Sequence, residues 1–392
     1  MIPRARFKIG ISFALFILLS ELVFGQEVSQ GVVGQVDGNR TITTAVPFLA
    51  IAPDARGSSL GFSGVATEAD FNSVHWNNAK LAFVNEQFGA SISYMPWLRN
   101  LTNDMYVGYL SGYWKIDDLQ TIGASFRYFD RGDFDVLDAQ SNIIGDFSPN
   151  ELAFDATYSR KLTDKIGLGF TLRYVISNIR DVTNPDQSGG SEGAVSTDLG
   201  FYYRTNFGER SELSFGGHIS NLGPKIQYID SKYFLPVNLR IGTAYKRDFD
   251  EINSVTISLD FNKFLVPTPP EVVRNLETGD FIIVDGRNPD RSLLSGVFGS
   301  FGDAPNGFSE ELQEISISFG AEYWYKDLAS FRLGYFGEHE EKGDRKIITT
   351  GLGFRYKEFG LDLSYLIPTS QNHPLGETLQ LTVSAAFDRK NE

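Results

Sequence analysis

The chain of 392 residues carries 49 acidic and 35 basic side chains, which gives a formal net charge of −14. Such an acidic protein is a poor partner for nucleic acid, because it repels the phosphates. The lack of cysteine excludes disulfides, thiolate metal sites, thiol nucleophiles and lipid attachment through an N-terminal cysteine. With 14% aromatic residues and 39 glycines, the composition suits an outer-membrane barrel, in which aromatic side chains gather at both membrane interfaces.

Residues 1–25 predict a secretory signal peptide. Basic side chains at Arg4, Arg6 and Lys8 precede an apolar run over residues 9–19. A membrane anchor is the alternative, but this run is shorter than the roughly 20 residues that span a bilayer as a helix. We therefore expect cleavage before Gln26.

Residues 26–87 do not have the pattern of a barrel wall. Residues 26–40 are polar and glycine-rich, and we expect a mobile lead-in there. Residues 41–80 contain many small side chains, with turn and helix-cap signals at 53–61. Small side chains permit close packing, so this segment is predicted to fold inside the barrel as a hatch or plug.

Residues 88–387 contain short runs in which apolar and polar side chains alternate, the period of a strand with two different faces. In residues 252–264, for example, aliphatic and aromatic side chains share one face and Asp260 lies on the other. Charged side chains are costly in lipid, so the polar face is predicted to line the lumen. We place fourteen such strands near 88–97, 104–115, 120–130, 150–160, 165–178, 194–205, 211–221, 236–246, 252–264, 313–325, 328–337, 346–357, 359–367 and 378–387.

The connections between these runs alternate between short and long, with only the first, at 98–103, of ambiguous length. A soluble β-sandwich also has alternating strands, but it has no reason to alternate its connection lengths. The sequence therefore predicts an all-β fold, a 14-stranded antiparallel transmembrane β-barrel with an N-terminal hatch and long extracellular loops. An even number of strands predicts periplasmic N and C termini. A short tail, residues 388–392, follows Phe387, the candidate aromatic anchor of the last strand.

The connection at 265–312 is far longer than the roughly 12–15 residues at which an unstructured loop becomes unusual. It contains an apolar stretch at 293–301, although the barrel places it outside the membrane. An exposed apolar patch indicates a protein-binding surface; the alternative is a lid that packs over the barrel mouth. The candidate partner-binding residues are Leu293, Leu294, Val297, Phe298, Phe301 and Phe308.

The sequence offers little support for catalysis or metal binding. His218 is expected in the lumen beside Ser214 and Ser220, which raises the alternative of a membrane-embedded hydrolase. The Gly-x-Ser-x-Gly turn of a serine nucleophile and the His-Glu-x-x-His motif of a zinc site are both absent. We therefore assign no catalytic, cofactor-binding or metal residue and interpret the chain as a non-enzyme. A calcium site among the acidic loop residues stays open.

Three segments of the chain carry a family resemblance. Residues 53–66 begin with Pro53 and Asp54-Ala55-Arg56 and continue into a run of small residues. Residues 75–80 are similar to the Trp-Asn-Pro-Ala element of FadL-like hatches, with Asn78 in the place of proline. Together with residues 300–312, these segments resemble the PorV (also LptO) family, outer-membrane barrels of the Bacteroidetes type IX secretion system within the FadL-like superfamily.

The resemblance implies an outer-membrane carrier. PorV-like barrels receive cargo proteins by their C-terminal signal domain at the giant translocon barrel (SprA or Sov). They then deliver the cargo to the PorU sortase complex at the surface. The implied partners are therefore the translocon, the sortase complex, cargo proteins and outer-membrane lipid, with no cofactor.

Two alternatives stay open. A FadL-type transporter of hydrophobic small molecules has the same barrel and hatch but needs an apolar path through the lumen. A general diffusion porin is the other alternative, although residues 41–80 would have no role in it.

Overall fold

The computed structural model describes residues 40–137, 141–179, 191–228, 231–275, 281–370, 375–376 and 378–388. The predicted signal peptide, most of the polar lead-in and residues 389–392 of the tail lie outside the described residues. No helix among the described residues is long and apolar enough to cross a membrane.

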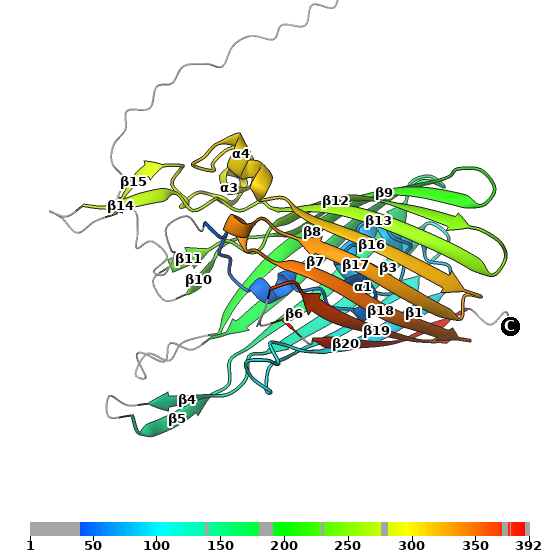
Figure 1. Ribbon diagram of the computed structural model, residues 1–392, viewed down its shortest axis with the longest axis horizontal. Coiled ribbons are helices and arrows are strands. Elements are labelled where there is room, and N and C mark those ends of the chain that lie inside the picture. The colour runs from blue at the N-terminus through cyan, green and yellow to red at the C-terminus, as the bar shows by residue number, and fades with distance from the viewer. Residues whose placement is uncertain are drawn as a thin grey trace, which may run out of the picture.

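Fourteen antiparallel strands form a closed barrel, as predicted (Figure 1). Every neighbouring pair of wall strands is hydrogen-bonded, and the last strand pairs with the first through Phe387 and Phe88. The wall strands in order are β1 (Phe88–Pro96), β2 (Tyr106–Lys115), β3 (Gln120–Asp130), β6 (Asn150–Lys161), β7 (Ile166–Asn178), β8 (Glu192–Asn206), β9 (Ser211–Leu222), β12 (Asn238–Asp248), β13 (Asn253–Phe264), β16 (Ser316–Tyr325), β17 (Ala329–Gly337), β18 (Lys346–Tyr356), β19 (Phe359–Pro368) and β20 (Leu379–Phe387).

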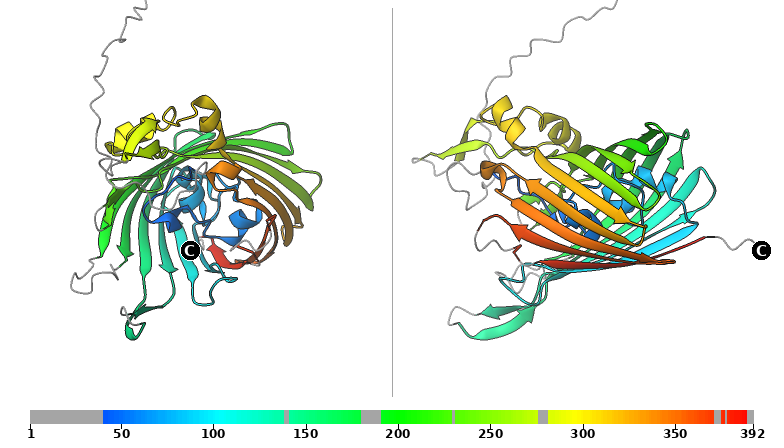
Figure 2. Two further views of the ribbon diagram at one scale, coloured as in Figure 1. Left: turned by 60° about the vertical axis from the view of Figure 1, so that its left-hand side comes forward. Right: turned by 45° about the vertical axis from the view of Figure 1, so that its right-hand side comes forward.

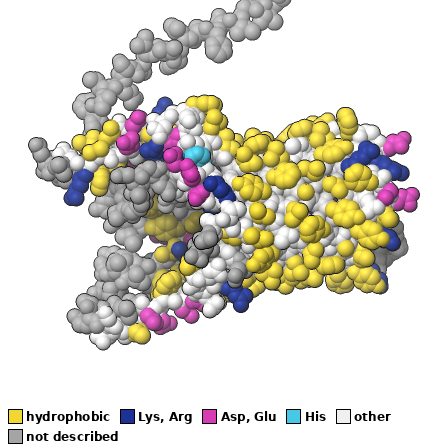
Figure 3. Space-filling view, viewed as in Figure 1, with side chains coloured by type: hydrophobic (Ala, Val, Ile, Leu, Met, Phe, Trp, Pro, Cys, Tyr) yellow, Lys and Arg dark blue, Asp and Glu magenta, His cyan; other side chains and the backbone are white. Residues whose placement is uncertain are grey.

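The alternation in sequence separates the two faces of the wall as predicted. In β13, Ile257 and Phe261 point outward and are exposed, whereas Asp260 points inward and is fully buried. Figure 3 shows the result on one face of the molecule, where hydrophobic side chains cover the outer wall and charged side chains gather toward its ends. Such a hydrophobic surface is the belt that a barrel presents to lipid.

Connection lengths differ between the two mouths of the barrel. One mouth has tight turns, such as Lys326–Asp327 between β16 and β17, where both residues adopt positive φ values of 54° and 50°. Two successive positive φ values in a tight hairpin turn match the right-handed twist of the flanking strands. All the long connections emerge at the other mouth, called the long-loop mouth below, and the ambiguous connection between β1 and β2 is one of them.

Within the described residues, three of the long connections contain short hairpins where loops were expected: β4–β5 (Phe134–Leu137 and Ile143–Phe147), β10–β11 (Ile226–Tyr228 and Ser231–Tyr233) and β14–β15 (Glu271–Arg274 and Phe281–Asp285). Each run is only three to five residues long, too short for its alternation to stand out in the sequence. The connection between β13 and β16 also contains two helices, α3 (Leu293–Gly299) and α4 (Phe308–Gln313).

Residues 40–87, called the lumenal segment below, lie inside the ring of strands (Figure 2). The segment folds into two 3₁₀ helices and two short α-helices: η1 (Pro47–Ala50), α1 (Ala55–Ser59), α2 (Ser73–Trp76) and η2 (Asn78–Phe83). Its backbone bonds to wall side chains on several sides, including Ser214 with Ala66, Thr349 with Gly61, and Thr382 with Ala55.

The described chain begins and ends at opposite mouths. Arg40 is bonded to Glu310 at the long-loop mouth, whereas Phe387 ends the last strand at the mouth with the tight turns. Both termini, which the even strand count predicts on the periplasmic side, lie outside the described residues.

Candidate functional site

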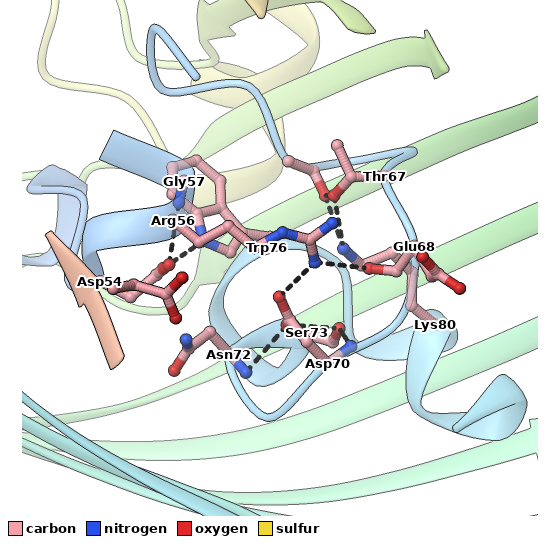
Figure 4. Close-up of polar contacts among 12 residues, drawn as sticks. Asp54, Arg56, Gly57, Thr67, Glu68, Asp70, Asn72, Ser73, Trp76 and Lys80 are labelled. Atoms are coloured by element: carbon pink, nitrogen blue, oxygen red, sulfur yellow. Dashed lines mark hydrogen bonds and ion pairs between the residues drawn. The ribbon is translucent and has the colours of Figure 1, made fainter. Parts of the chain in front are cut away.

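The Asp54-Ala55-Arg56 motif organises the centre of the lumenal segment (Figure 4). The carboxylate of Asp54 caps helix α1 by accepting a hydrogen bond from the backbone N–H of Gly57 at 2.9 Å. The same carboxylate accepts a bond of 2.6 Å from the indole N–H of Trp76. One side chain thus joins α1 to α2, although the two helices are separated by a loop.

Arg56 connects the lumenal segment to the barrel wall. Its guanidinium lies 2.9 Å from Glu322 on β16 and 2.8 Å from Asp70 within the segment. Glu322 also pairs with Arg332 on β17 at 2.7 Å, and all these side chains are largely buried. Removing one member of a buried ion pair leaves the other charge uncompensated, so this network holds the segment in one position.

A second attachment involves the two asparagines of the Trp76-Asn77-Asn78-Ala79 element. The Asn77 amide donates to the carbonyls of Val65 and Phe201 at 2.9 Å each. The Asn78 amide donates to Thr171 Oγ1 on β7 at 2.8 Å. A proline at position 78 could not make this bond, so the departure from the family pattern adds a polar contact to the wall.

Glycines on the lumen face allow the segment to approach the wall closely. A Cβ at Gly216 would lie 2.1 Å from the carbonyl oxygen of Val65, and one at Gly334 would lie 2.0 Å from the backbone nitrogen of Gly61. No atom lies within 4 Å of such a Cβ at Gly217, the next residue on β9. Contact therefore depends on which face of the strand a glycine occupies.

We expect Gly216→Ala to displace the lumenal segment near Val65, because the backbone there cannot yield as a flexible side chain does. Overpacking of this kind costs roughly 1–3 kcal/mol. Hydrogen exchange of residues 60–70 should become faster. Gly217→Ala is the matched control and should leave exchange unchanged; equal exchange in both variants would contradict the close packing.

A cavity of about 580 Å³ lies between the lumenal segment and the loops of the long-loop mouth. Apolar side chains such as Phe48, Trp97 and Phe129 line much of it, and Arg131 and Glu338 supply charge. The cavity is large enough for a small molecule. The lumenal segment forms part of its lining.

The structure divides the six candidate partner-binding residues of the long loop into three pairs. Leu293 and Val297 pack against the barrel mouth beside Phe234 and Leu265. The pair Leu294 and Phe298, called the α3 face below, lies on the opposite side of the helix and is 64% and 73% exposed. Phe301 and Phe308 are exposed too and lie beside the outer wall.

Ion pairs fix the helical part of this loop to the rest of the long-loop mouth. Glu310 on α4 accepts from Arg40 at 2.9 Å and from Lys342 at 2.6 Å. Glu314 pairs with Lys342 at 2.9 Å and with Lys263 at 2.5 Å. These contacts join the lumenal segment, the long loop and the loop between β17 and β18.

Burial favours the neutral form of Glu310, but hydrogen bonds from Arg40 and Lys342 outweigh it and lower the pKa of Glu310 to about 2, from an ordinary value of 4.5. A carboxylate with a lowered pKa stabilises the folded loop above its ordinary pKa. That contribution disappears as the pH falls from 4.5 through about 2.

We therefore expect Glu310→Gln to loosen α4 at pH 7 and still at pH 5, with the difference from the native protein vanishing near pH 2. The chain has no cysteine, so one nitroxide at Ser309→Cys reports the motion of α4 by electron paramagnetic resonance. A matched variant, Glu341→Gln, changes an acid in the adjacent loop and should leave the spectrum unchanged. Equal spectra for native protein and Glu310→Gln at pH 7 would contradict the role of this ion pair.

The histidines that the structure describes lie in separate environments. His218 is buried in the lumen as expected, 4.0 Å from Asp198, and His75 lies 2.8 Å from Arg127. Within the described ranges no group of three histidine or acidic side chains is arranged to hold a metal ion.

The sequence alone did not indicate the ion pairs of Glu322, Glu310 and Lys342. The partners lie far apart in the chain, with Arg56 and Glu322 separated by 266 positions and Glu310 and Lys342 by 32. Glu322 alone carried a signal, because a charge inside an alternating strand marks the lumen face.

Comparison with known proteins gives one family match. The family model described as "Type IX secretion system protein PorV" matches residues 34–271. No curated protein is significantly similar to the chain in sequence.

Several solved barrels are similar in fold. The toluene transporter TbuX of Ralstonia pickettii is 9% identical, with 85% of this chain and 98% of that chain covered and a TM-score of 0.48. A FadL homologue of Pseudomonas aeruginosa is 11% identical, with 89% and 100% covered and a TM-score of 0.49. The toluene transporter TodX of Pseudomonas putida is 11% identical, with 88% and 98% covered and a TM-score of 0.48.

Proposed function

We propose that this chain, which belongs to the PorV family of type IX secretion system proteins, is the carrier that receives cargo at the translocon and delivers it to the surface sortase complex. Membership of the family makes it an outer-membrane component of that secretion system. The finer role, with cargo bound by its C-terminal signal domain, is our proposal.

The observation that carries this proposal is the filled lumen. The lumenal segment is bonded to wall strands on several sides, through Arg56, Asn78 and the contacts of Ser214 and Thr349. A folded cargo domain is far too large to share this space. Cargo must then be bound outside the lumen, and the lumenal segment acts as the hatch.

The α3 face supplies a surface suited to such a partner. Leu294 and Phe298 are held outward because Leu293 and Val297 anchor the other side of the helix. Large apolar side chains on a fixed element resemble the anchors that dominate protein interfaces. We place this surface outside the cell and the mouth with the tight turns in the periplasm, as in other outer-membrane barrels.

Affinity purification of the tagged protein from detergent-solubilised outer membranes tests the proposal. We expect recovery of a very large barrel, a sortase complex or proteins with C-terminal signal domains. Deletion of the protein should leave cargo unattached at the surface while the outer membrane stays intact. Normal cargo attachment after deletion would contradict the proposal.

The apolar cavity at the long-loop mouth favours a second candidate function, uptake of hydrophobic small molecules. Its volume of about 580 Å³ suits such a ligand. The hydrogen-bonded ring of wall strands is closed, so a ligand would have to pass the lumenal segment. Loss of fatty-acid uptake with normal protein secretion in the deletion strain would favour this candidate.

A further inference from the structure

Helix α4 has the reverse of the polarity expected for a surface helix. Its acidic residues Glu310 and Glu311 are buried, whereas Phe308 and Leu312 are 76% and 52% exposed. Both acids pair with cations, Glu310 with Arg40 and Glu311 with Lys263, so the apolar side chains occupy the exposed side of the helix. A helix in water would present its charges outward.

The position of this helix relative to the wall explains what its apolar side faces. Lys263 is the penultimate residue of β13 and lies opposite Leu239 in register. Its ammonium group lies 2.9 Å from Glu311 and 2.5 Å from Glu314. Because Asn262, beside Lys263, bonds to Arg240 in the lumen, Lys263 is on the outward side of the strand. Helix α4 therefore lies against the outside of the wall.

Between this helix and the wall is a groove of about 200 Å³, called the wall groove below. Its surface is almost entirely apolar. The wall contributes Leu239, Ile241 and Phe261, and the loop contributes Phe301, Phe308 and Leu312.

The wall groove is continuous with the lipid-facing belt. Ile241 pairs with Phe261, and Phe261 pairs in turn with Ile317 on β16. All three point outward and are between 42% and 53% exposed. In Figure 3, hydrophobic side chains cover the wall up to the region of α3 and α4. The groove therefore opens onto hydrocarbon at the long-loop end of the belt.

We propose that the wall groove binds one acyl chain of an outer-leaflet lipid. Lys263 and Glu311, which border the groove, are paired with each other, so its surface is almost entirely apolar. Such a lining with exposed aromatic side chains matches a hydrocarbon chain and offers almost no polar partner for a peptide backbone. The groove floor is wall that already faces lipid, so an acyl chain enters without crossing water. Phe308 and Leu312 then cover the chain from the other side. This inference does not depend on the cargo-carrier function.

Native mass spectrometry of the full barrel, purified gently from outer membranes, tests the proposal. The native protein should retain one lipid, and its mass distinguishes phospholipid from lipopolysaccharide as the source of the chain. Phe308→Ser with Leu312→Ser should lower retention about tenfold, because both side chains lose their apolar contact area. Val273→Ser, an exposed apolar position on β14 of the same loop, is the matched control and should retain the lipid.

A second measurement identifies the occupant in the membrane. p-Benzoylphenylalanine at position 308 should, on irradiation of intact outer membranes, give adducts with the mass of a lipid. No bound lipid in the native protein, equal retention in the double variant, or adducts that are mainly protein would overturn the proposal. The photoreactive variant keeps an aromatic side chain at 308, so it remains informative if the serine variant fails to fold.

Discussion

Replacing Glu322 with alanine is expected to release the central part of the lumenal segment and to open the barrel to ions. The substitution removes the acceptor shared by Arg56 and Arg332, which are almost completely buried. Breaking a buried ion pair from one side costs about 3–5 kcal/mol. A cost of about 3 kcal/mol raises the population of molecules with a displaced lumenal segment roughly 100-fold.

Conductance in planar bilayers measures this opening, and hydrogen exchange of residues 55–60 locates it. Glu322→Gln keeps the shape and part of the hydrogen bonding, so we expect an intermediate effect. Lys346→Ala breaks an exposed ion pair with Asp344 at the long-loop mouth and serves as the control, because exposed pairs contribute little. Native conductance together with native exchange in Glu322→Ala would show that the segment is held elsewhere.

The wall of the barrel could be predicted because its signal is local. In β13 and β16 the side chains alternate between lipid and lumen, and every second residue repeats the same environment. A period of two can be recognised within one strand without knowledge of its neighbours. The closed ring then follows from strand number and connection length.

The attachment of the lumenal segment could not be predicted in the same way. Composition alone indicated that residues 41–80 pack closely, but no local pattern pairs Arg56 with Glu322 rather than with another lumenal acid. The choice depends on the register of the whole barrel and on the path of the segment through it. Contacts of this kind become visible only in three dimensions.

The partner-binding role of the long loop stays a prediction, but the structure shows which of its apolar side chains are exposed. The apolar content of residues 293–301 indicated a surface, but six residues were assigned to it as if they were equivalent. The spacing of Leu293 with Val297, and of Leu294 with Phe298, is that of two faces of one helix. Helical periodicity in this short stretch could have separated the buried pair from the exposed pair.

We expect Leu294→Ser combined with Phe298→Ser to abolish recovery of the translocon and cargo in affinity purification. Anchor side chains at an interface each contribute about 2 kcal/mol or more, so the loss of two lowers affinity roughly 1,000-fold. Barrel stability should be unaffected, because the closed ladder of backbone hydrogen bonds and the lipid-facing belt include neither residue.

Three outcomes of this experiment have different meanings. Lost recovery with a heat-modifiable, membrane-inserted barrel identifies the α3 face as the partner surface. Misfolding of the double variant would make this stretch a structural lid, because removal of exposed side chains from a pure interface leaves the fold intact. Normal recovery would assign recognition to another loop.

Val284→Ser on β15, exposed and apolar in the same long loop, is the matched control and should recover partners as the native protein does. The contrast between these two variants separates a specific contact of Leu294 and Phe298 from general loss of apolar surface.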